Sequence, residues 1–408
     1  LIKLKKNLEM SKKKAKISWA LYDFANSSFP TLVTTFLFST YFTQVLAPSP
    51  EKGTALWGTA TGIAGVIIAI TSPFIGSIAD HTGKRKPWLA FFTILCIVST
   101  ALMWFVEPNE DFILFALFLT IIGTIALEIG HVFYNTMLAD LVPKDEIGKL
   151  SGQAWGLGYF GGLICLFLAL GIFIDPPVKL FQLNNEAAEP IRASMVLTAV
   201  WFALFSWPIF VYTQDKNKTG VNIFVAISHA KQSITNTIMN LKYYSNIFIF
   251  LISRMVYIDG VNTMFAFGGI YAAGTFSMTL EEVIIFGIAM NCFAGLGAFM
   301  FAWVDDKRGS RFTIVYSVLA LIIFGTAILV VQSKTMFLVF ALLLAIFIGP
   351  AQSASRSMMA RLAPADLRGE FFGLYALSGK ATAFLGPAIV GLVTDVFQSQ
   401  RIGMATII

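Results

Sequence analysis

The chain carries a succession of long apolar runs, and these constrain its fold more than any other feature. Eleven runs can be delimited, and a twelfth begins at Arg401. They cover residues 17–47, 57–79, 88–106, 112–140, 151–174, 191–213, 247–272, 283–304, 312–332, 335–361 and 370–395. Runs of about 20 apolar residues cross a bilayer as helices, which satisfy their own backbone hydrogen bonds. With 57% hydrophobic and only 13% charged residues, a water-soluble fold is excluded. The sequence therefore predicts an all-α, multi-pass integral membrane protein.

Basic residues mark alternate connections between the runs. With the N-terminus inside the cell, most of the 29 Lys and Arg lie in or beside cytoplasmic segments. The outer connections carry acids instead, such as Glu107 and Glu110. The positive-inside rule therefore predicts a cytoplasmic N-terminus, and we expect a prokaryotic cytoplasmic membrane. Membrane topology also accounts for the net charge of +6 without a nucleic-acid partner.

Both ends of the chain are expected to differ from those of the natural protein. Met10 is a candidate start, so residues 1–9 would be translated upstream sequence. Residues 1–16 form a basic cytoplasmic tail, because the first run is too long and too polar for a cleavable signal. The twelfth run stops at Ile408, well short of the roughly 20 residues that a span needs. We therefore expect the last helix to be truncated.

Two of the runs carry the same polar signature, D-x-x-N-[S/T]-x-F. The first copy contains Asp23 and Asn26, and the second contains Asp259 and Asn262. Residues three apart share one face of a helix, and a carboxylate within a span usually faces a cavity or a partner. Two further blocks recur in the same order, one after runs two and eight and one after runs four and ten. This order predicts two parallel six-helix repeats, at 17–213 and 247–408.

Residues 214–246, between the repeats, form the longest polar stretch. Apolar residues recur there at helical spacing, at Ile223, Ile227, Ala230, Ile234, Ile238 and Leu241. The pattern predicts an amphipathic helix that lies on the cytoplasmic leaflet and tethers the two halves. A regulatory or partner-binding role is the alternative.

The block after the second run resembles the loop signature of the major facilitator superfamily. Its first copy comprises Gly76, Asp80, Gly83, Lys84 and Arg85, and its second comprises Asp306, Gly309 and Arg311. Two positions depart from the family pattern: His81 in the first copy, and Ala302 in place of the first glycine in the second copy. The resemblance implies a 12-helix fold in which these loops act as gates that stabilise one conformation. In physical terms, the first glycine permits close helix packing, the aspartate caps or pairs with a neighbouring helix, and the basic residues hold the loop at the surface.

The first run, W-A-L-Y-D-F-A-N-S from Trp19 to Ser27, is similar to the opening of the vacuole-effluxer-like branch of this superfamily, the autophagy-related permeases. Fungal members are implicated in returning amino acids from the vacuole. The resemblance therefore implies a secondary active transporter that moves a small solute, plausibly an amino acid, by alternating access. Protons, or else sodium, would drive it, and the protein would be monomeric.

The fourth run carries Glu128, His131 and Asn135 on one helical face. The repeat places Gln352 and Arg356 of the tenth run at the positions of His131 and Asn135, which favours a cavity-lining face in both halves. Glu128 and His131 have the chemistry of a proton relay. A static polar network, in which Glu128 neutralises Arg356 or Lys380, is the competing interpretation.

Lys380 lies within the eleventh run, where a central charge costs about 3 kcal/mol. We expect it to pair with an aspartate or to contact a substrate carboxylate or phosphate. Arg254 lies close enough to the cytoplasmic end to extend its charge to the surface. Three acids and three bases within the runs fit a zwitterionic substrate, and they fit internal salt bridges with an uncharged substrate equally well. The coupling or substrate candidates are Asp23, Asn26, Glu128, His131, Asn135, Asp259, Asn262, Gln352, Arg356 and Lys380.

Two other functions remain open at this point. A cation-coupled sugar symporter would use aromatic side chains to stack its sugar, and Trp19, Trp155 and Trp201 are candidates. A membrane enzyme or lipid-handling protein would need a metal or nucleophile motif. The three histidines are scattered, the three cysteines each lie in an apolar run, and we find no nucleophile motif. We therefore expect no enzyme activity, no metal and no cofactor.

Overall fold

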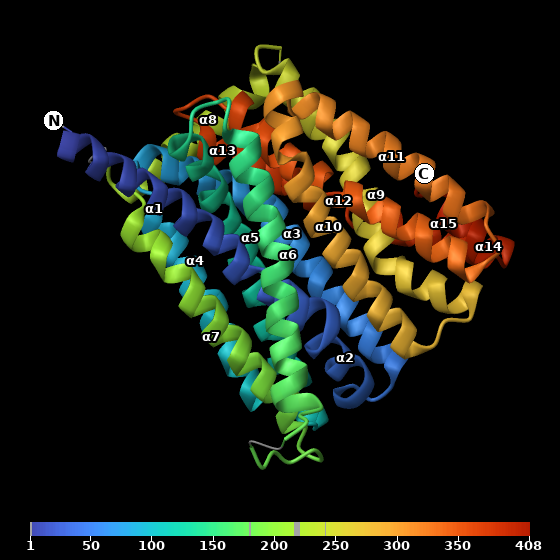
Figure 1. The fold of residues 1–408 in the computed structure, drawn as a ribbon. Helices are drawn as coiled ribbons and strands as arrows, with labels where there is room; N and C mark the ends of the chain where they lie inside the picture. The colour runs from blue at the N-terminus through green and yellow to red at the C-terminus, as the bar shows by residue number, and fades with distance from the viewer. Residues whose placement is uncertain (1, 179–180, 216–220, 241) are drawn as a thin grey trace.

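The computed structural model describes residues 2–178, 181–215, 221–240 and 242–408, which form a bundle of helices joined by short loops (Figure 1). No strand occurs in these residues. The α-helices are α1 (Ile2–Asn26), α2 (Phe38–Tyr41), α3 (Pro50–Thr82), α4 (Lys86–Leu102), α5 (Ile113–Leu141), α6 (Ile147–Ala169), α7 (Glu189–Tyr212), α8 (Ile223–Met239), α9 (Ser245–Phe276), α10 (Leu280–Arg308), α11 (Ser310–Val330), α12 (Lys334–Leu362), α13 (Arg368–Lys380), α14 (Leu385–Phe397) and α15 (Gln400–Ala405). Short π- and 3-10-helical segments are η1 (Phe29–Phe36), η2 (Phe42–Leu46), η3 (Met103–Phe105), η4 (Glu110–Phe112) and η5 (Leu170–Ile174).

Ten helical segments in the described residues are long and apolar enough to cross a membrane. They correspond in order to the second to eleventh apolar runs. The prediction of an all-α integral membrane protein is confirmed. Figure 1 shows α1, α4 and α7 on one side of the molecule and α9, α11, α14 and α15 on the other.

Two predicted spans are not the single helices that hydropathy suggested. The first run is α-helical only up to Asn26 and continues as the π-helical η1. Pro30 lacks a backbone N–H, and the hydroxyl groups of Ser27 and Ser28 donate hydrogen bonds to backbone carbonyls of the preceding turn. Both features disturb the regular α-helical hydrogen bonding. The eleventh run is broken between Lys380 and Leu385. Pro387, the third residue of α14, lies in the first turn, where its missing backbone N–H is tolerated, whereas it would break a continuing helix.

The helices of the two predicted repeats, α1 to α7 and α9 to α15, form the two groups of helices. These groups meet through two close pairs, α3 with α13 and α6 with α10. Glycines permit both contacts. A Cβ on Gly76 would overlap the backbone of Gly369, and a Cβ on Gly152 would overlap Ala298 and Ala302. All these residues lie toward one end of the bundle, where α8 and the loops 83–85, 142–146 and 363–367 are found. We call this end the basic face.

Toward the opposite end of the bundle the contacts disappear. Gly58, Gly62 and Gly65 in α3 have no heavy atom within 4 Å of the position of a Cβ. The same holds for Gly391 in α14. The two groups of helices are therefore packed together at the basic face and separate away from it.

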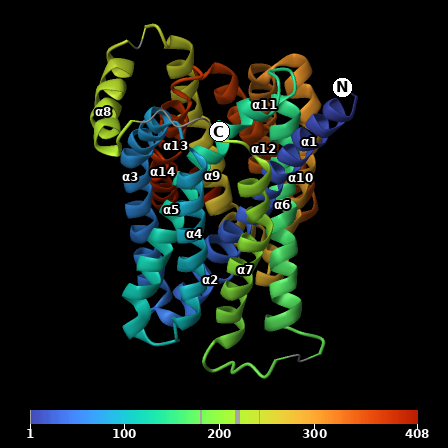
Figure 2. The same cartoon turned by 90° about the vertical axis from the view of Figure 1, so that its left-hand side faces the viewer.

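The predicted linker contains the helix α8, which lies beside α3 (Figure 2). Ala226, Ala230 and Ile234 are buried on this side, whereas Phe224 and Ile227 are exposed. Hydropathy predicted the helix, whereas its position on the leaflet stays a prediction, and Leu241 of the predicted apolar face lies outside the described residues. Hydropathy did not predict that one face of α8 packs on the protein.

We expect Gly76→Val to open the basic face without unfolding the chain. The new side chain overlaps the backbone of Gly369, so α3 and α13 must separate, whereas contacts within each group of helices are unchanged. The measurement is maleimide labelling of a cysteine placed at the fully buried Ser72. Labelling should rise several-fold. Gly62→Val, whose side chain meets only open space, is the matched control, and equal labelling in the two variants would contradict the prediction.

Candidate functional site

A cavity of about 410 Å³ lies between the two groups of helices, with walls from α1, α5, α6, α9, α12 and α13. Nine of the ten coupling or substrate candidates line it. These are Asp23, Asn26, Glu128, His131, Asn135, Asn262, Gln352, Arg356 and Lys380. The tenth, Asp259, does not. The repeat-based expectation of a shared polar interface thus corresponds to one physical space, although the roles of its residues stay predictions.

Arg356 forms a dry ion pair that joins the two groups of helices. Its Nη1 lies 2.7 Å from Oδ2 of Asp23, and the Arg356 side chain is 1% exposed. Nε donates to Ser151 Oγ at 2.9 Å and Nη2 donates to the Ser151 carbonyl at 2.7 Å. The guanidinium also lies over the rings of Trp19 and Trp155. Every donor-bearing nitrogen of Arg356 is therefore occupied, and its acidic partner is Asp23, not Glu128.

Lys380 forms a second ion pair, and this one is open to the cavity. Its Nζ lies 2.7 Å from Oε1 of Glu128, and the two side chains are 29% and 26% exposed. Of the two kinds of partner expected for it, an aspartate was wrong, and Glu128, which reaches it across the cavity from α5, is confirmed. His131 Nδ1 lies 4.0 Å from Glu128 Oε2, which is too long for a hydrogen bond. The three side chains nevertheless form one accessible, titratable group.

Amide side chains supply neutral donors and acceptors to the same cavity. Asn26 Nδ2 and Asn135 Oδ1 are buried without a hydrogen-bond partner. Gln352 Oε1 accepts from Trp155 Nε1 at 3.2 Å and from Tyr159 Oη at 2.8 Å. Unsatisfied buried polar atoms are costly, and both asparagines line the cavity. Tyr159 was not predicted. Its position four residues after Trp155 places the two side chains on the same face of α6, and this spacing could have identified it.

Two ionisable residues lie differently from what the sequence suggested. Arg254 does not reach the surface: it is 8% exposed and lines the cavity, and its Nη1 donates to the Tyr375 carbonyl at 2.8 Å and to Ser378 Oγ at 2.7 Å. Asp259 turns away from the cavity, and its Oδ2 accepts from the backbone N–H of Gly386 at 3.0 Å. The break in the eleventh run explains this, because the new N-terminus of α14 needs an acceptor.

The two predicted gating aspartates cap helices of the opposite group. Asp80, at the end of α3, accepts from the backbone N–H of Glu370 in the first turn of α13 at 3.0 Å. Asp306, at the end of α10, accepts from Gly148 and Lys149 at the start of α6, at 2.7 and 2.9 Å. A carboxylate is stabilised at the positive N-terminus of a helix. The two caps are equivalent under the sequence repeat, and both close the basic face.

Arginines at the basic face add further bonds. Arg368 on α13 pairs with Asp140 on α5, which crosses between the two groups. Arg85 also pairs with Asp140, at 2.8 Å, and is 3% exposed. Arg85 was expected to hold its loop at the surface, so its burial corrects that expectation. Arg361 binds Asp306 at 2.7 Å. Sequence reasoning missed Arg361, Arg368 and Asp140. All three flank the repeated block that follows runs four and ten, which reads L-x-P-x-D at 141–145 and at 362–366.

The other predicted gating residues serve the turns between helices. Gly83 and Gly309 have φ angles of 74° and 87°, which favour glycine because other residues are strained there. Lys84 lies in the loop after Gly83 and is partly exposed, and Arg311 lies exposed in the first turn of α11. These positions fix the direction of the chain at the basic face.

Glu370 connects three helices at the basic face and was not predicted. It is fully buried and accepts hydrogen bonds from Ser77 on α3 at 3.0 Å and from Ser233 and Thr237 on α8 at 2.6 and 2.5 Å. The sequence alone makes it an ordinary acid in a first helical turn. Its burial arises only because α8 packs over the junction of α3 and α13.

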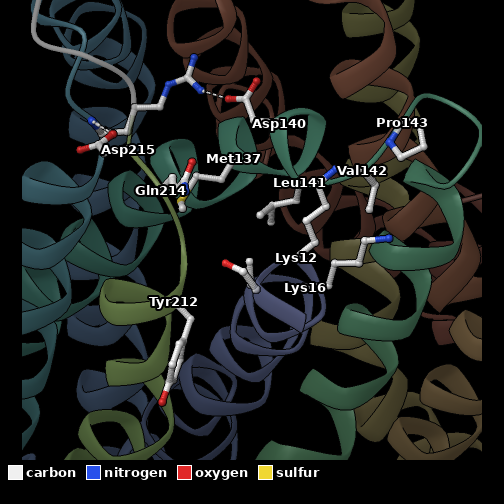
Figure 3. A pocket seen from close by; sticks show the side chains of 13 residues that line it. Lys12, Lys16, Met137, Asp140, Leu141, Val142, Pro143, Tyr212, Gln214 and Asp215 are labelled. Atoms are coloured by element: carbon white, nitrogen blue, oxygen red, sulfur yellow. Dashed lines mark hydrogen bonds and ion pairs between the residues drawn. The ribbon is translucent and has the colours of Figure 1, made fainter. Parts of the chain in front are cut away.

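A larger cavity of about 750 Å³ lies at the basic face near Lys12, Lys16 and Tyr212 (Figure 3). Several charged groups around it have partners within the protein. Lys16 binds Glu146 at 2.6 Å, and this hydrogen bond lowers the pKa of Glu146. Asp215 accepts from two backbone N–H groups at the start of α4. None of the ten coupling or substrate candidates lines this cavity, so we place the candidate site in the smaller central cavity. The described residues contain no group of three His, Cys, Asp or Glu placed to hold a metal.

Comparisons with known proteins agree with this architecture. The model of a protein family described as vacuole effluxer Atg22 like matches residues 54–408. The uncharacterized MFS-type transporter YxiO of Bacillus subtilis is 28% identical over 93% of this chain and 88% of its own length. Autophagy-related protein 22 of Eremothecium gossypii is 22% identical over 76% of this chain, which spans 66% of that protein. The proton:xylose symporter XylE, solved with a bound bromo-deoxyglucose, superposes with a TM-score of 0.74 at 14% identity, over 98% of this chain and 94% of that one. The likeness to XylE shows the fold, and the family match, which covers the loop block but begins after the first run, confirms the family that the sequence resembled.

We expect Asp23→Ala to destabilise the protein far more than loss of one surface charge would. It leaves the buried cation of Arg356 without its acid, which costs about 3–5 kcal/mol. Chemical unfolding of the purified protein measures the change. A second substitution, Arg356→Gln, should recover part of the loss. If the double variant loses as much free energy of unfolding as the two single variants combined, the two residues do not act as a pair.

Asp80→Asn combined with Asp306→Asn should loosen the basic face. Each lost charge at a helix N-terminus weakens closure by about 0.3–1 kcal/mol, so the ratio of closed to open molecules should fall several-fold. Distances between spin labels on the loops before α6 and α13 report this ratio. Asp111→Asn, at an exposed site on the opposite end, is the control. An unchanged distance distribution in the double variant would refute the role of the caps.

Proposed function

We propose that this chain, which belongs to the vacuole effluxer Atg22-like family of the major facilitator superfamily, moves an amino acid across the membrane with protons as its driving ion. At the coarser level it is a multi-pass membrane transporter of the MFS type. The observation that carries the finer proposal is the central cavity, which gathers nine polar candidates from both groups of helices into one space. An accessible ion pair within it offers both a site for a charged solute and a titratable acid.

Alternating access follows from the way the two groups of helices meet. Paired helix caps and glycine contacts hold them together at the basic face, and these bonds are all local to that face. Rocking about the central cavity breaks a small set of polar contacts and leaves each group of helices intact. We place the basic face in the cytoplasm, on the positive-inside rule. The described conformation is then the one closed to the cytoplasm.

We assign proton coupling to Glu128. Protonation removes its charge, so it no longer holds Lys380, and the cation becomes free to bind or release a solute. His131 is near enough to exchange a proton with Glu128 after a small rotation. Asp23 is a weaker candidate because Arg356 occupies it in a dry environment. Asp259 is weaker still because it caps α14 outside the cavity.

Amino acids suit the cavity because it presents charges of both signs within a partly apolar wall. Glu128 is an acceptor for an ammonium group, and Lys380 and Arg254 are donors for a carboxylate. Val132, Ile258 and Phe372 provide apolar lining for a side chain. A solute of roughly amino-acid size fits a volume of about 410 Å³.

A cation-coupled sugar symporter is the second candidate, because neutral hydrogen-bonding groups also line the cavity. Trp155, Asn26, Asn135 and Asn262 combine an aromatic face with amides, a set that suits a sugar. Trp19 and Trp201, the other aromatic candidates, do not line the cavity. Counterflow uptake in proteoliposomes, measured separately for labelled xylose and for labelled valine, decides between the two candidates.

We expect Glu128→Gln to abolish accumulation of labelled valine driven by a pH gradient in proteoliposomes. The neutral amide cannot carry the coupling proton, so accumulation should fall at least about tenfold, whereas exchange of valine at equal pH should persist. Asp259→Asn is the matched control, because its carboxylate lies outside the cavity. Normal gradient-driven accumulation by Glu128→Gln would exclude Glu128 as the coupling acid.

A further inference from the structure

The charges that line the central cavity do not balance. Arg254, Arg356 and Lys380 contribute three positive charges, and Asp23 and Glu128 contribute two negative ones. Three minus two leaves one positive charge, with His131 neutral. The third acid of the spans, Asp259, does not line the cavity. Because a net charge buried in a membrane protein is costly, this excess calls for an anion from outside the chain.

The excess charge belongs to Arg254. Arg356 and Lys380 each have a carboxylate at 2.7 Å. Among the described residues, no carboxylate lies within 4.0 Å of the Arg254 guanidinium, whose bonded partners are a carbonyl and a hydroxyl. The side chain is 8% exposed, and the flat face of its guanidinium lies 3.6 Å from the centre of the Tyr375 ring. Tyr375 stabilises the cation but does not neutralise it.

One edge of the Arg254 guanidinium is unoccupied. Both of its hydrogen bonds to described residues leave from Nη1, toward Tyr375 and Ser378. Nε is buried without a partner, and Nη2 has none among the described residues. Nε and Nη2 together present the two parallel N–H groups that the two oxygens of a carboxylate accept. A side chain at Gly379 would press against this guanidinium, at 3.2 Å from Nη2, so the glycine leaves it uncovered on the cavity side.

We propose that Arg254 is the carboxylate-binding residue of the transport site and that the substrate is an organic monocarboxylate. The inference rests on the proposed transport function and adds a substrate class to it. One carboxylate neutralises the one excess charge and fills both free N–H groups. The ammonium group of an amino acid contacts Glu128 but restores the excess positive charge, so the carboxylate is the required element. A phosphate dianion would leave the cavity with one negative charge in excess.

Four related probes test the requirement. Valine carries both charged groups, isovalerate lacks the ammonium, isobutylamine lacks the carboxylate, and valinamide replaces the carboxylate with a neutral amide. In detergent, valine and isovalerate should raise the melting temperature of the full chain by binding its folded state. Isobutylamine, valinamide and inorganic phosphate should not. Arg254→Gln should weaken binding of valine and isovalerate at least about tenfold, which is the scale of a lost charge-assisted hydrogen bond.

Folding of the variant is expected because Arg254→Gln leaves no acid unpaired, unlike a substitution at Arg356. Arg254→Lys keeps the charge and loses the planar fork, so it should bind isovalerate with intermediate affinity. Arg192→Gln is the control: Arg192 is also buried, near Trp104 and Glu107, but it is not part of the cavity wall. It should leave the preference for carboxylates unchanged.

The outcomes separate this inference from the proposed function. If Arg254→Gln retains the preference of the wild type for isovalerate over valinamide, Arg254 is not the carboxylate site. If the wild type transports valinamide or xylose as well as valine, transport stands and the monocarboxylate requirement falls. If isovalerate binds in an Arg254-dependent way but labelled valine does not cross the membrane, the inference stands and amino-acid transport falls. No response to any probe would overturn both.

Discussion

The architecture depends on a single kind of contact made twice: an aspartate at the end of one helix caps the first turn of a helix in the opposite group. Asp80 caps α13 and Asp306 caps α6. Each cap satisfies backbone N–H groups that a helix start leaves unpaired, and it does so with a charge that the helix dipole favours. Such a bond is strong enough to hold a face closed and weak enough to release it. The central cavity exists because the closure is confined to this face.

Within the cavity, two ion pairs of similar length differ in their access to solvent, and this difference separates their roles. Asp23 and Arg356 are dry and saturated by further bonds, so their pairing ties α1 to α12. Glu128 and Lys380 are each about one quarter exposed, so a solute or a proton reaches them. A buried pair resists change because separating it leaves an uncompensated charge. An accessible pair exchanges partners at far lower cost, as binding and coupling require.

The sequence predicted the spans, the repeat and nine polar residues of the cavity, because hydropathy and helical periodicity are local properties. It also located both capping aspartates, since the repeat marks them. The sequence did not predict which acid pairs with which base. Glu128 was a candidate for either Arg356 or Lys380, and only the folded structure, which brings Asp23 within 2.7 Å of Arg356, decides between them. The burial of Glu370 likewise arises from three helices that are distant in sequence. Arg254 looked near the surface because its depth is set by the tilt and packing of α9.

The aspartates of the two D-x-x-N signatures make different contacts, and the break between α13 and α14 explains why. Asp23 meets a cation from the other group, whereas Asp259 meets the N-terminus that the break creates at Gly386. The same break ends α13 at Lys380, so the negative end of that helix helps to hold the cation at the cavity. A continuous helix would have no terminus at either position. The interruption of the eleventh run therefore removes one acid from the cavity and fixes one base in it. It leaves Arg254 as the unmatched charge that an anionic substrate is suited to neutralise.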